Sequence, residues 1–334
     1  MTRDGLNFET LWGAAAQAAA DGIAQHAFQS EAWVEAVSAA RGRPHRFVVV
    51  RVVGGDYSGA CLFGGVHRRF GIEVFESMPM GGYGGWCFAG VLDEDQEWLL
   101  TRAWLARSPW WVVSLTGAPG RERSVPASRN FAWLPSSWRD RLAERSLTTH
   151  ILSLAGDDEA LLRRARSKAR NHLRRVDRSG FVFDVGGDHA VAEFCRLFRA
   201  GSAEWKHRPQ GLMPDEFFRR LHDGGSADIW RVTKDGRCSA AAMFLKGRTE
   251  VFYQASGTIK EPGEVSPTDA LLWTAIRHYR DRGYRTLNLG ASEGLDSVRF
   301  FKEKLGGVAT SYRHVTFVLP KLLVPAARTT APRQ

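Results

Sequence analysis

The alternation of apolar and polar residues divides the first half of the chain into short strands and amphipathic helices. Runs rich in β-branched and aromatic residues predict strands over 46–53, 58–66, 71–78, 110–115 and 148–154. Apolar residues at three- and four-residue spacing predict two helices within 11–40 and a third over 93–107. Such mixing of strands and helices predicts an α/β fold with a mixed sheet.

The second half shows the same two periodicities more clearly. Helical spacing covers 157–179, 189–205, 214–222, 266–282 and 295–305. Strand patterns cover 180–185, 227–233, 238–246, 250–256, 285–289 and 309–319. Lys234-Asp235-Gly236 and Gly247-Arg248 suit tight hairpin turns, so the strands between 227 and 256 are predicted to form a meander.

The helix over 266–282 carries start and stop signals of its own. Ser266 is the predicted N-cap, Pro267 takes the first helical position, and Asp269 stands where a capping box places its acid. Gly283 ends the helix. The tail from Pro325 onward is basic and is predicted to be disordered.

Length and composition indicate a globular protein of two domains. The 334 residues exceed the usual size of one hydrophobic core, and we divide the chain into domains over 1–150 and 151–322, followed by a basic tail over 323–334. Apolar residues make up 44% and charged residues 25%, which excludes wholesale disorder. The chain has no run of about 18 apolar residues, so no stable membrane insertion is expected.

Net charge bears on the possible partners of the protein, and cysteine content bears on its compartment. The formal net charge of +10 and the pI of about 9.8 favour polyanions, although a basic surface kept for solubility explains them equally well. Four scattered cysteines without a Cys-x-x-Cys pair suggest reduced, buried thiols in a cytoplasmic protein. No histidines pair at ligand spacing on a helix face, so no metal site is expected.

Four motifs, taken in order along the chain, resemble the FemAB-like branch of the GNAT superfamily. They are Ser77-Met78-Pro79 leading to Tyr83-Gly84-Gly85, a basic helix from Arg166 to Gly180, Asn288-Leu289-Gly290, and Phe301-Lys302-x-x-Leu305-Gly306. Asn288 stands where the family pattern usually has an acid. The resemblance implies two tandem GNAT-like lobes, over 1–150 and 151–322, with an active cleft at their junction.

The resemblance also implies an aminoacyltransferase. Such proteins take an aminoacyl group from aminoacyl-tRNA, a co-substrate rather than a bound cofactor, and transfer it to an amine, often on a peptidoglycan precursor. No inserted helical arm interrupts the second lobe, which favours a small-molecule or peptide amine as acceptor. An acyl-CoA-dependent N-acyltransferase and a non-catalytic nucleic-acid-binding protein remain the alternatives. The residues 256–263 lack the Gly-rich pattern that binds the pyrophosphate of CoA.

Lys302 is the main candidate for catalysis, because the resemblance places this lysine beside the reacting carbonyl with Phe301 packed beneath it. The alternative is a solvated lysine on a charged helix that also bears Arg299. Tyr253, Glu293 and Asp296 are candidates for accepting a proton or orienting the amine. The residues predicted to bind substrate are Tyr83, Gly84, Gly85, Lys206, Arg208, Asn288 and Glu293.

The helix predicted over 157–179 combines an apolar stripe with a dense set of cations. The stripe consists of Leu162, Ala165, Ala169, Leu173 and Val176. Arg166, Lys168, Arg170 and Arg174 lie on the other faces and are predicted to bind phosphates of tRNA or of a nucleotide-linked substrate. The alternative is a solvated helix whose cations pair with Asp157, Asp158 and Glu159.

Overall fold

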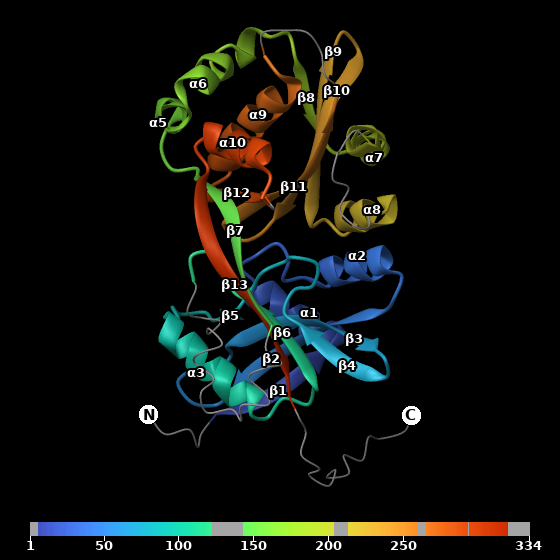
Figure 1. The fold of residues 1–334 in the computed structure, drawn as a ribbon, viewed down its shortest axis with the longest axis vertical. Helices are drawn as coiled ribbons and strands as arrows, with labels where there is room; N and C mark the ends of the chain where they lie inside the picture. The colour runs from blue at the N-terminus through green and yellow to red at the C-terminus, as the bar shows by residue number, and fades with distance from the viewer. Residues whose placement is uncertain (1–5, 122–142, 204–212, 260–264, 293, 320–334) are drawn as a thin grey trace.

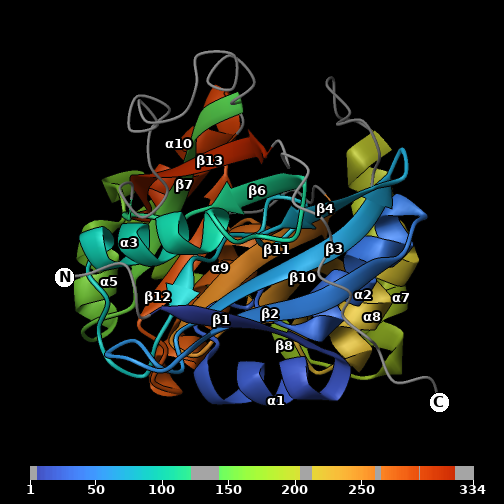
Figure 2. The same cartoon turned by 90° about the horizontal axis from the view of Figure 1, so that it is seen from below.

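The first lobe is a mixed sheet with helices on both faces. In the computed structural model, which describes residues 6–121, 143–203, 213–259, 265–292 and 294–319, its strands are β1 (Asn7–Trp12), β2 (His45–Val53), β3 (Cys61–Arg69), β4 (Ile72–Glu76), β5 (Trp86–Cys87) and β6 (Val112–Thr116). Its helices are α1 (Gly13–Ile23), α2 (Glu31–Arg41) and α3 (Glu94–Leu105). Helix α3 covers one face of the sheet, and α1 and α2 cover the other (Figure 2).

The second lobe repeats this plan. It contains α5 (Asp158–Arg164), α6 (Ser167–Leu173), the 3-10 helix η3 (Val176–Arg178), β8 (Val182–Val185), α7 (Asp188–Ala203), α8 (Asp215–Asp223), β9 (Ala227–Lys234), β10 (Arg237–Lys246), β11 (Glu250–Thr258), α9 (Pro267–Asp281), β12 (Thr286–Ala291) and α10 (Asp296–Lys304). The meander β9–β10–β11 is antiparallel, as predicted. Asp235 and Gly236 both have positive φ at the first hairpin, which is the backbone that such a tight turn requires.

Two long strands join the lobes into one continuous sheet. Strand β13 (Val308–Val318) pairs with β7 (Ala143–Ser153) along its length and with β6 of the first lobe at its C-terminal end. Strand β7 in turn pairs with β12. The described residues thus form one sheet in the order β1-β2-β3-β4-β6-β13-β7-β12-β11-β10-β9-β8, with β5 on β3 (Figure 1). The division predicted at 150/151 falls inside β7.

The lobes also share a hydrophobic core. Helix α2 of the first lobe packs against α8 of the second, and the rings of Trp33 and Phe217 meet edge to face with 5.5 Å between their centroids. Both side chains are at most 1% exposed. Burying an aromatic side chain of this size stabilises a fold by about 2–3 kcal/mol, so this contact holds the two lobes in a fixed relation.

The prediction of one continuous helix over 157–179 is wrong, because the segment is interrupted. The chain leaves the helical conformation at Ala165, where ψ is 145°, and at Arg166, where ψ is 148°. The Arg166 N–H donates to the Lys304 carbonyl at 2.9 Å instead of continuing the helix. The apolar stripe is nevertheless buried along its whole length, which explains why the periodicity pointed to a helix.

The start of α9 follows the prediction only in part. Pro267 occupies the first turn, but the Ser266 side chain makes no capping hydrogen bond. Asp269 is 3% exposed and accepts a hydrogen bond of 2.7 Å from Lys304, so the predicted capping box is replaced by a contact with α10. None of the helices in the described ranges has both the length and the apolarity needed to cross a membrane.

All four cysteines are buried and none forms a disulfide, as predicted. Burial raises the pKa of Cys61 to about 11 and that of Cys87 to about 12. Burial likewise raises the pKa of Cys195 and of Cys238 to about 12. Thiols with such pKa values remain protonated at neutral pH, and a protonated thiol is a poor nucleophile.

Candidate active site

Strands β11 and β12 diverge partway along their length. They run parallel and pair at only three positions, the last of which joins Phe252 to Asn288. Beyond this point β11 stays with β10 up to Thr258, whereas Ala291 of β12 pairs with Thr149 of β7. The divergence leaves backbone groups on the facing edges without a ladder partner between these strands, and such edges are suited to binding a ligand.

Lys302 lies at this divergence. Its side chain is 4% exposed, and its ammonium donates to the carbonyl of Ala291 at the end of β12. Gly290, whose φ is +77°, lies beside it: a Cβ there would be in van der Waals contact, 3.7 Å from Lys302 Nζ and 3.8 Å from the Tyr253 carbonyl. The structure therefore excludes the alternative in which Lys302 is a solvated surface residue.

The neighbours of Lys302 on α10 behave differently. Arg299 and Asp296 are exposed and pair with each other at 2.7 Å, which leaves Asp296 as a surface residue. Phe301 is partly buried against the core of the second lobe. The Lys304 ammonium lies 5.0 Å from the centre of the Phe301 ring. The structure thus gives Phe301 a packing role, one of the two roles considered for it.

Tyr253 lies on β11 at the first position after the strands part. Its hydroxyl donates to the hydroxyl of Ser256 on the same strand, and burial raises its pKa to about 12. A phenol with that pKa stays protonated at neutral pH. Tyr253 is therefore suited to donating a hydrogen bond and unsuited to accepting a proton as a phenolate.

A buried polar network joins the two lobes next to this site. Asn288 Nδ2 donates to the hydroxyl of Tyr83 at 2.6 Å, and Tyr83 donates to the carboxylate of Glu250. Asn288 Oδ1 accepts from Thr149 at 2.6 Å and from the N–H of Gly290 at 2.9 Å. Burial and the Glu250 charge raise the pKa of Tyr83 well above its ordinary value. Two residues predicted separately as substrate contacts thus bind each other.

The glycine-rich loop packs against the protein. The N–H of Gly84 donates to the Thr116 carbonyl at 3.2 Å, and a Cβ at Gly84 would come within 3.2 Å of Gln29 Nε2. Gly85 has a φ of +129°, which an L side chain rarely adopts. The loop therefore lies against the Gln29 side chain and places Tyr83, which is 1% exposed, in the network between the lobes.

His150 is a residue of this site that the sequence patterns did not single out. It lies on β7, is 2% exposed, and has its Nδ1 3.4 Å from the hydroxyl of Ser292. Its Nε2 is buried and has no hydrogen-bond partner in the described part of the chain. Burial and the charge of Lys302 both lower its pKa. A titratable residue inside the strand predicted over 148–154 was the signal that the sequence offered.

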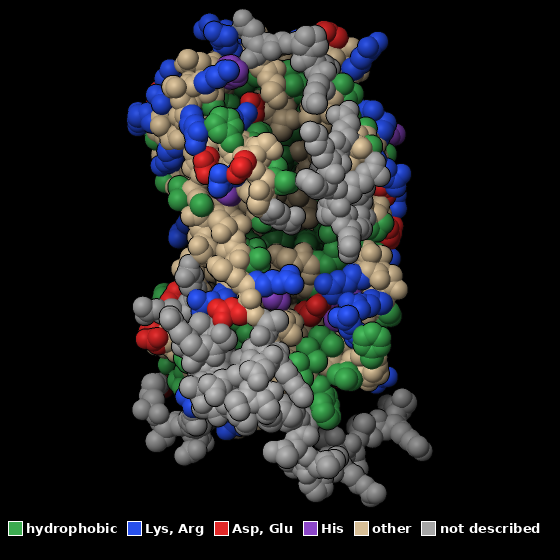
Figure 3. All heavy atoms as spheres, viewed as in Figure 1, with side chains coloured by type: hydrophobic (Ala, Val, Ile, Leu, Met, Phe, Trp, Pro, Cys, Tyr) green, Lys and Arg blue, Asp and Glu red, His purple; other side chains and the backbone are tan. Residues whose placement is uncertain are grey.

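A cavity lies between the lobes beside the polar network. It has a volume of about 270 Å³ and is lined from the first lobe by Asp21 and His26 and from the second by Lys246 and Arg248. His26 Nδ1 lies 3.5 Å from the Glu250 carboxylate and has no hydrogen-bond partner in the described ranges. Separately from this pocket, the face drawn in Figure 3 is hollowed between the lobes, with Lys and Arg side chains along the lower edge of the hollow.

The cations predicted to bind phosphate have different surroundings. Arg174 pairs with Glu159 at 3.1 Å, as in the alternative of a solvated, paired helix face, whereas Arg166 pairs with Glu303 of α10 at 2.8 Å. Arg170 donates to the carbonyl of Ala165 at 3.3 Å. Lys168 is exposed and has no ion-pair partner within the described ranges. Glu293, Lys206 and Arg208 lie outside the described residues.

Comparisons with known proteins agree with this architecture. Residues 163–302 match the family model for an acetyltransferase (GNAT) domain. The crystal structure of FemX superposes with a TM-score of 0.66 and 12% identity over 91% of this chain and 96% of that one. The structure of L-PGS from Bacillus licheniformis superposes with a TM-score of 0.52 and 14% identity over 90% of both chains. Comparison with curated proteins gave no match.

At these identities the solved structures establish the fold, and the family model matches part of the second lobe. The matched range runs from α5 to α10 and ends at Lys302. Its diverging strands β11 and β12 and the helix α10 therefore belong to the matched domain. The chain accordingly has two GNAT-like lobes in a FemX-like fold, as the FemAB-like resemblance predicted, and residues 163–302 of its second lobe match the GNAT domain model.

Proposed function

We propose that this protein is an acyltransferase that forms an amide bond, with an aminoacyl-tRNA as donor and an amine on a small molecule, peptide or peptidoglycan precursor as acceptor. The main observation in support of this proposal is the buried ammonium of Lys302 at the divergence of β11 and β12. The FemX-like fold supports the aminoacyl donor.

The proposed reaction needs a stabilised oxyanion and a neutral amine. The amine nitrogen attacks the ester carbonyl of the donor, a C–N bond forms, and negative charge develops on the carbonyl oxygen. Lys302 would stabilise that charge after exchanging its bond to Ala291 for one to the oxyanion. A preorganised cation in a poorly solvated site acts more strongly there than it would in water.

The reaction also has to release the tRNA and transfer a proton to it. The ester C–O bond breaks, and the terminal ribose hydroxyl of the tRNA leaves after taking up a proton. The attacking amine supplies one proton in the same reaction. His150 is the proposed carrier, because it is buried at this site and its Nε2 has no hydrogen-bond partner within the described ranges.

An acyl-CoA-dependent N-acyltransferase is the second candidate. The family model that matches residues 163–302 is described as an acetyltransferase domain, which favours an acyl-CoA donor. Against it stands the segment from Ser256, which lacks the glycine pattern for a pyrophosphate. Both candidates share the amine acceptor and the oxyanion at Lys302, so the donor alone distinguishes them.

A donor competition tests the proposal. Purified protein is incubated with a mixture of ¹⁴C-aminoacyl-tRNAs or with ¹⁴C-acetyl-CoA, together with a panel of amino acids, dipeptides and a peptidoglycan-type peptide. Label that moves from tRNA into an alkali-stable product reports an amide, because the tRNA ester is cleaved by mild alkali. We expect such a product, and we expect donor affinity to fall steeply between 50 and 200 mM salt (~10-fold or more).

Two results would count against the proposal. Transfer from acetyl-CoA alone would replace it by the second candidate. Transfer from neither donor, with retained salt-sensitive tRNA binding, would favour a nucleic-acid-binding role without catalysis.

A further inference from the structure

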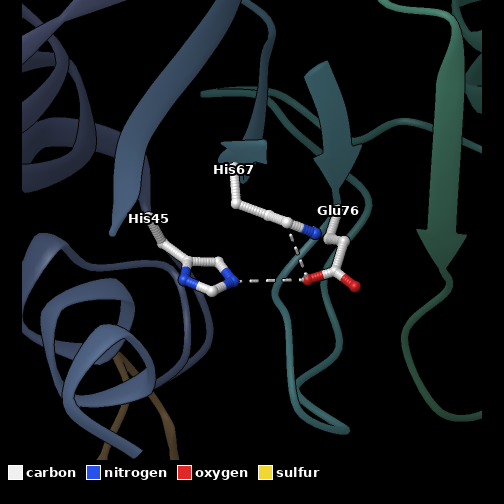
Figure 4. Close-up of side chains that lie close together, drawn as sticks. All are labelled: His45, His67 and Glu76. Carbon is white, nitrogen blue, oxygen red and sulfur yellow. Dashed lines mark ion pairs between the residues drawn. The ribbon is translucent and has the colours of Figure 1, made fainter. Parts of the chain in front are cut away.

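Three polar side chains gather at one end of strands β2, β3 and β4 in the first lobe. His45 begins β2 and lies directly opposite His67 of β3. Glu76 ends β4 and faces Gly65, two residues before His67, so it lies diagonally across the strand pair from His67. The close-up shows both imidazoles directed toward the same carboxylate (Figure 4).

The distances in this cluster are too long for hydrogen bonds. His67 Nδ1 lies 3.7 Å and His45 Nε2 lies 3.9 Å from the same oxygen of Glu76. One donor atom from each of the three residues lies within 4.8 Å of the others. Nitrogen and oxygen ligands at about 2.0–2.2 Å from Zn²⁺ stand about 3.4 Å apart in a tetrahedral site. The separations between donor atoms therefore have to contract by at most about 1.4 Å.

The ring of His45 presents a lone pair to the cluster. Its Nδ1 lies 3.0 Å from the carbonyl of Arg43, which can only accept, so this nitrogen carries the hydrogen. The other nitrogen, Nε2, is then unprotonated in the neutral ring. A backbone carbonyl that holds one N–H of a histidine while the other nitrogen binds the ion is the usual support of a metal-ligating histidine.

The ring of His67 gives an independent indication. The residue is 4% exposed, and its buried Nδ1 has no hydrogen-bond partner within the described ranges. A buried polar atom without a partner costs about 1–3 kcal/mol. A metal ion between His67, His45 and Glu76 would satisfy it. Burial also lowers the pKa of both imidazoles, which keeps them in the neutral form that binds metals.

Arg41 competes with a cation for this position. Its guanidinium donates to Glu76 and lies 3.2 Å from His45 Nε2. The side chain of Arg41 is 25% exposed at the end of α2, so it can turn toward solvent when an ion binds. The charge of Arg43 also acts on both histidines and opposes a cation. These arginines lower the affinity of the cluster for a cation. We therefore expect a variant without Arg41 to bind the ion more tightly.

We propose that His45, His67 and Glu76 bind one Zn²⁺ ion in the first lobe. Two imidazoles and a carboxylate match the ligand preference of this borderline metal and leave a fourth position for water. The ion would link β2, β3 and β4, away from Lys302 in the second lobe. This inference does not depend on the proposed transfer reaction.

Zinc titration of the chelator-treated, untagged protein tests the site, with a chromophoric chelator as competitor. We expect one Zn²⁺ per chain and a melting temperature that rises with Zn²⁺. His45→Gln and His67→Gln should each weaken binding by about 100-fold, and Arg41→Ala should tighten it. His222→Gln is the matched control, because His222 lies outside the cluster beside Asp223. It should bind as the wild type does.

A second measurement uses the wild type alone, in case a substituted chain fails to fold. Co²⁺ in place of Zn²⁺ should give the visible absorption of a four-coordinate site. Absence of stoichiometric binding at micromolar protein overturns the proposal. Equal binding by His67→Gln and the wild type, or a Co²⁺ spectrum no different from that of the ion in water, does so as well.

Discussion

Asn288 of β12 donates a hydrogen bond of 2.6 Å to the hydroxyl of Tyr83, which comes from the other lobe. The Tyr83 hydroxyl in turn donates a hydrogen bond to the carboxylate of Glu250, which is 9% exposed. A buried carboxylate is costly unless it is hydrogen-bonded, so each lobe supplies a group that the other needs. The relation makes Tyr83 part of the framework that fixes the lobes at the candidate site.

Tyr83→Phe should therefore destabilise the protein by about 1–3 kcal/mol, because it removes the donor to Glu250 and the acceptor of Asn288 while keeping the ring. Urea unfolding measures this loss. Tyr57→Phe is the matched control, since Tyr57 is a buried tyrosine of the same lobe outside this network. Equal stability of Tyr83→Phe and the wild type would show that the network contributes nothing.

The periodic elements could be predicted from the sequence, whereas contacts between distant segments could not. The meander over 227–256 follows from alternation and turn residues that are local to the chain. The break at Ala165 depends on a hydrogen bond from Arg166 to Lys304, and the burial of Asp269 depends on the same lysine. The residue pattern around Ala165 or around Asp269 gives no sign of these contacts with Lys304.

The candidate site shows the same limit. Lys302 was found because it lies in a motif, and the structure adds that its ammonium is buried. His150 and Glu250 lie on strands with no motif around them, so only the fold brings them to the site. His45 and His67 are ligand candidates only because β2 and β3 pair in that register, which a search for ligands on one helix face cannot detect.

Lys302→Met should leave the fold intact and lower the rate of transfer about 10²–10³-fold, the usual effect of removing one group that stabilises an oxyanion. Steady-state rates with the active donor, together with circular dichroism, check this. Arg299→Met removes an exposed cation from the same helix and should stay within about twofold of the wild type. Near-normal turnover by a folded Lys302→Met would remove Lys302 from the mechanism.

The pKa of His150 should rise in Lys302→Met. The positive charge of Lys302 favours the neutral imidazole and so lowers this pKa, and its removal relieves that effect. NMR titration of ¹³C-labelled histidine rings measures the shift. His278 serves as an internal reference, because burial and Arg282 lower its pKa without a contribution from Lys302. An unchanged pKa of His150 would contradict the electrostatic coupling.

The stability of the metal-free protein should fall as pH is lowered from about 6.5 to about 4. Burial lowers the pKa of His67 to about 4 in the folded chain, against about 6.5 when unfolded. The unfolded chain thus binds the proton first on acidification, which favours unfolding by up to about 3 kcal/mol. Urea unfolding in chelator at several pH values should show a shallower dependence for His67→Gln. Parallel curves for the two proteins would contradict this prediction.

Substitution by alanine should change the stability of the protein in opposite directions at Gly257 and at Gly201. Gly257 lies on β11 where α7 crosses it, and a Cβ there would come within 2.2 Å of the Leu197 carbonyl carbon. Backbone cannot yield as a flexible side chain can, so Gly257→Ala should cost about 3 kcal/mol, the upper end for overpacking. Gly201 lies within α7, and a Cβ added there would have nothing within 4 Å. Gly201→Ala should stabilise the protein by about 0.5–1 kcal/mol, because alanine loses less backbone entropy in a helix. Chemical denaturation of both variants decides the point, and a Gly257→Ala chain as stable as Gly201→Ala would show that β11 and α7 do not pack this closely.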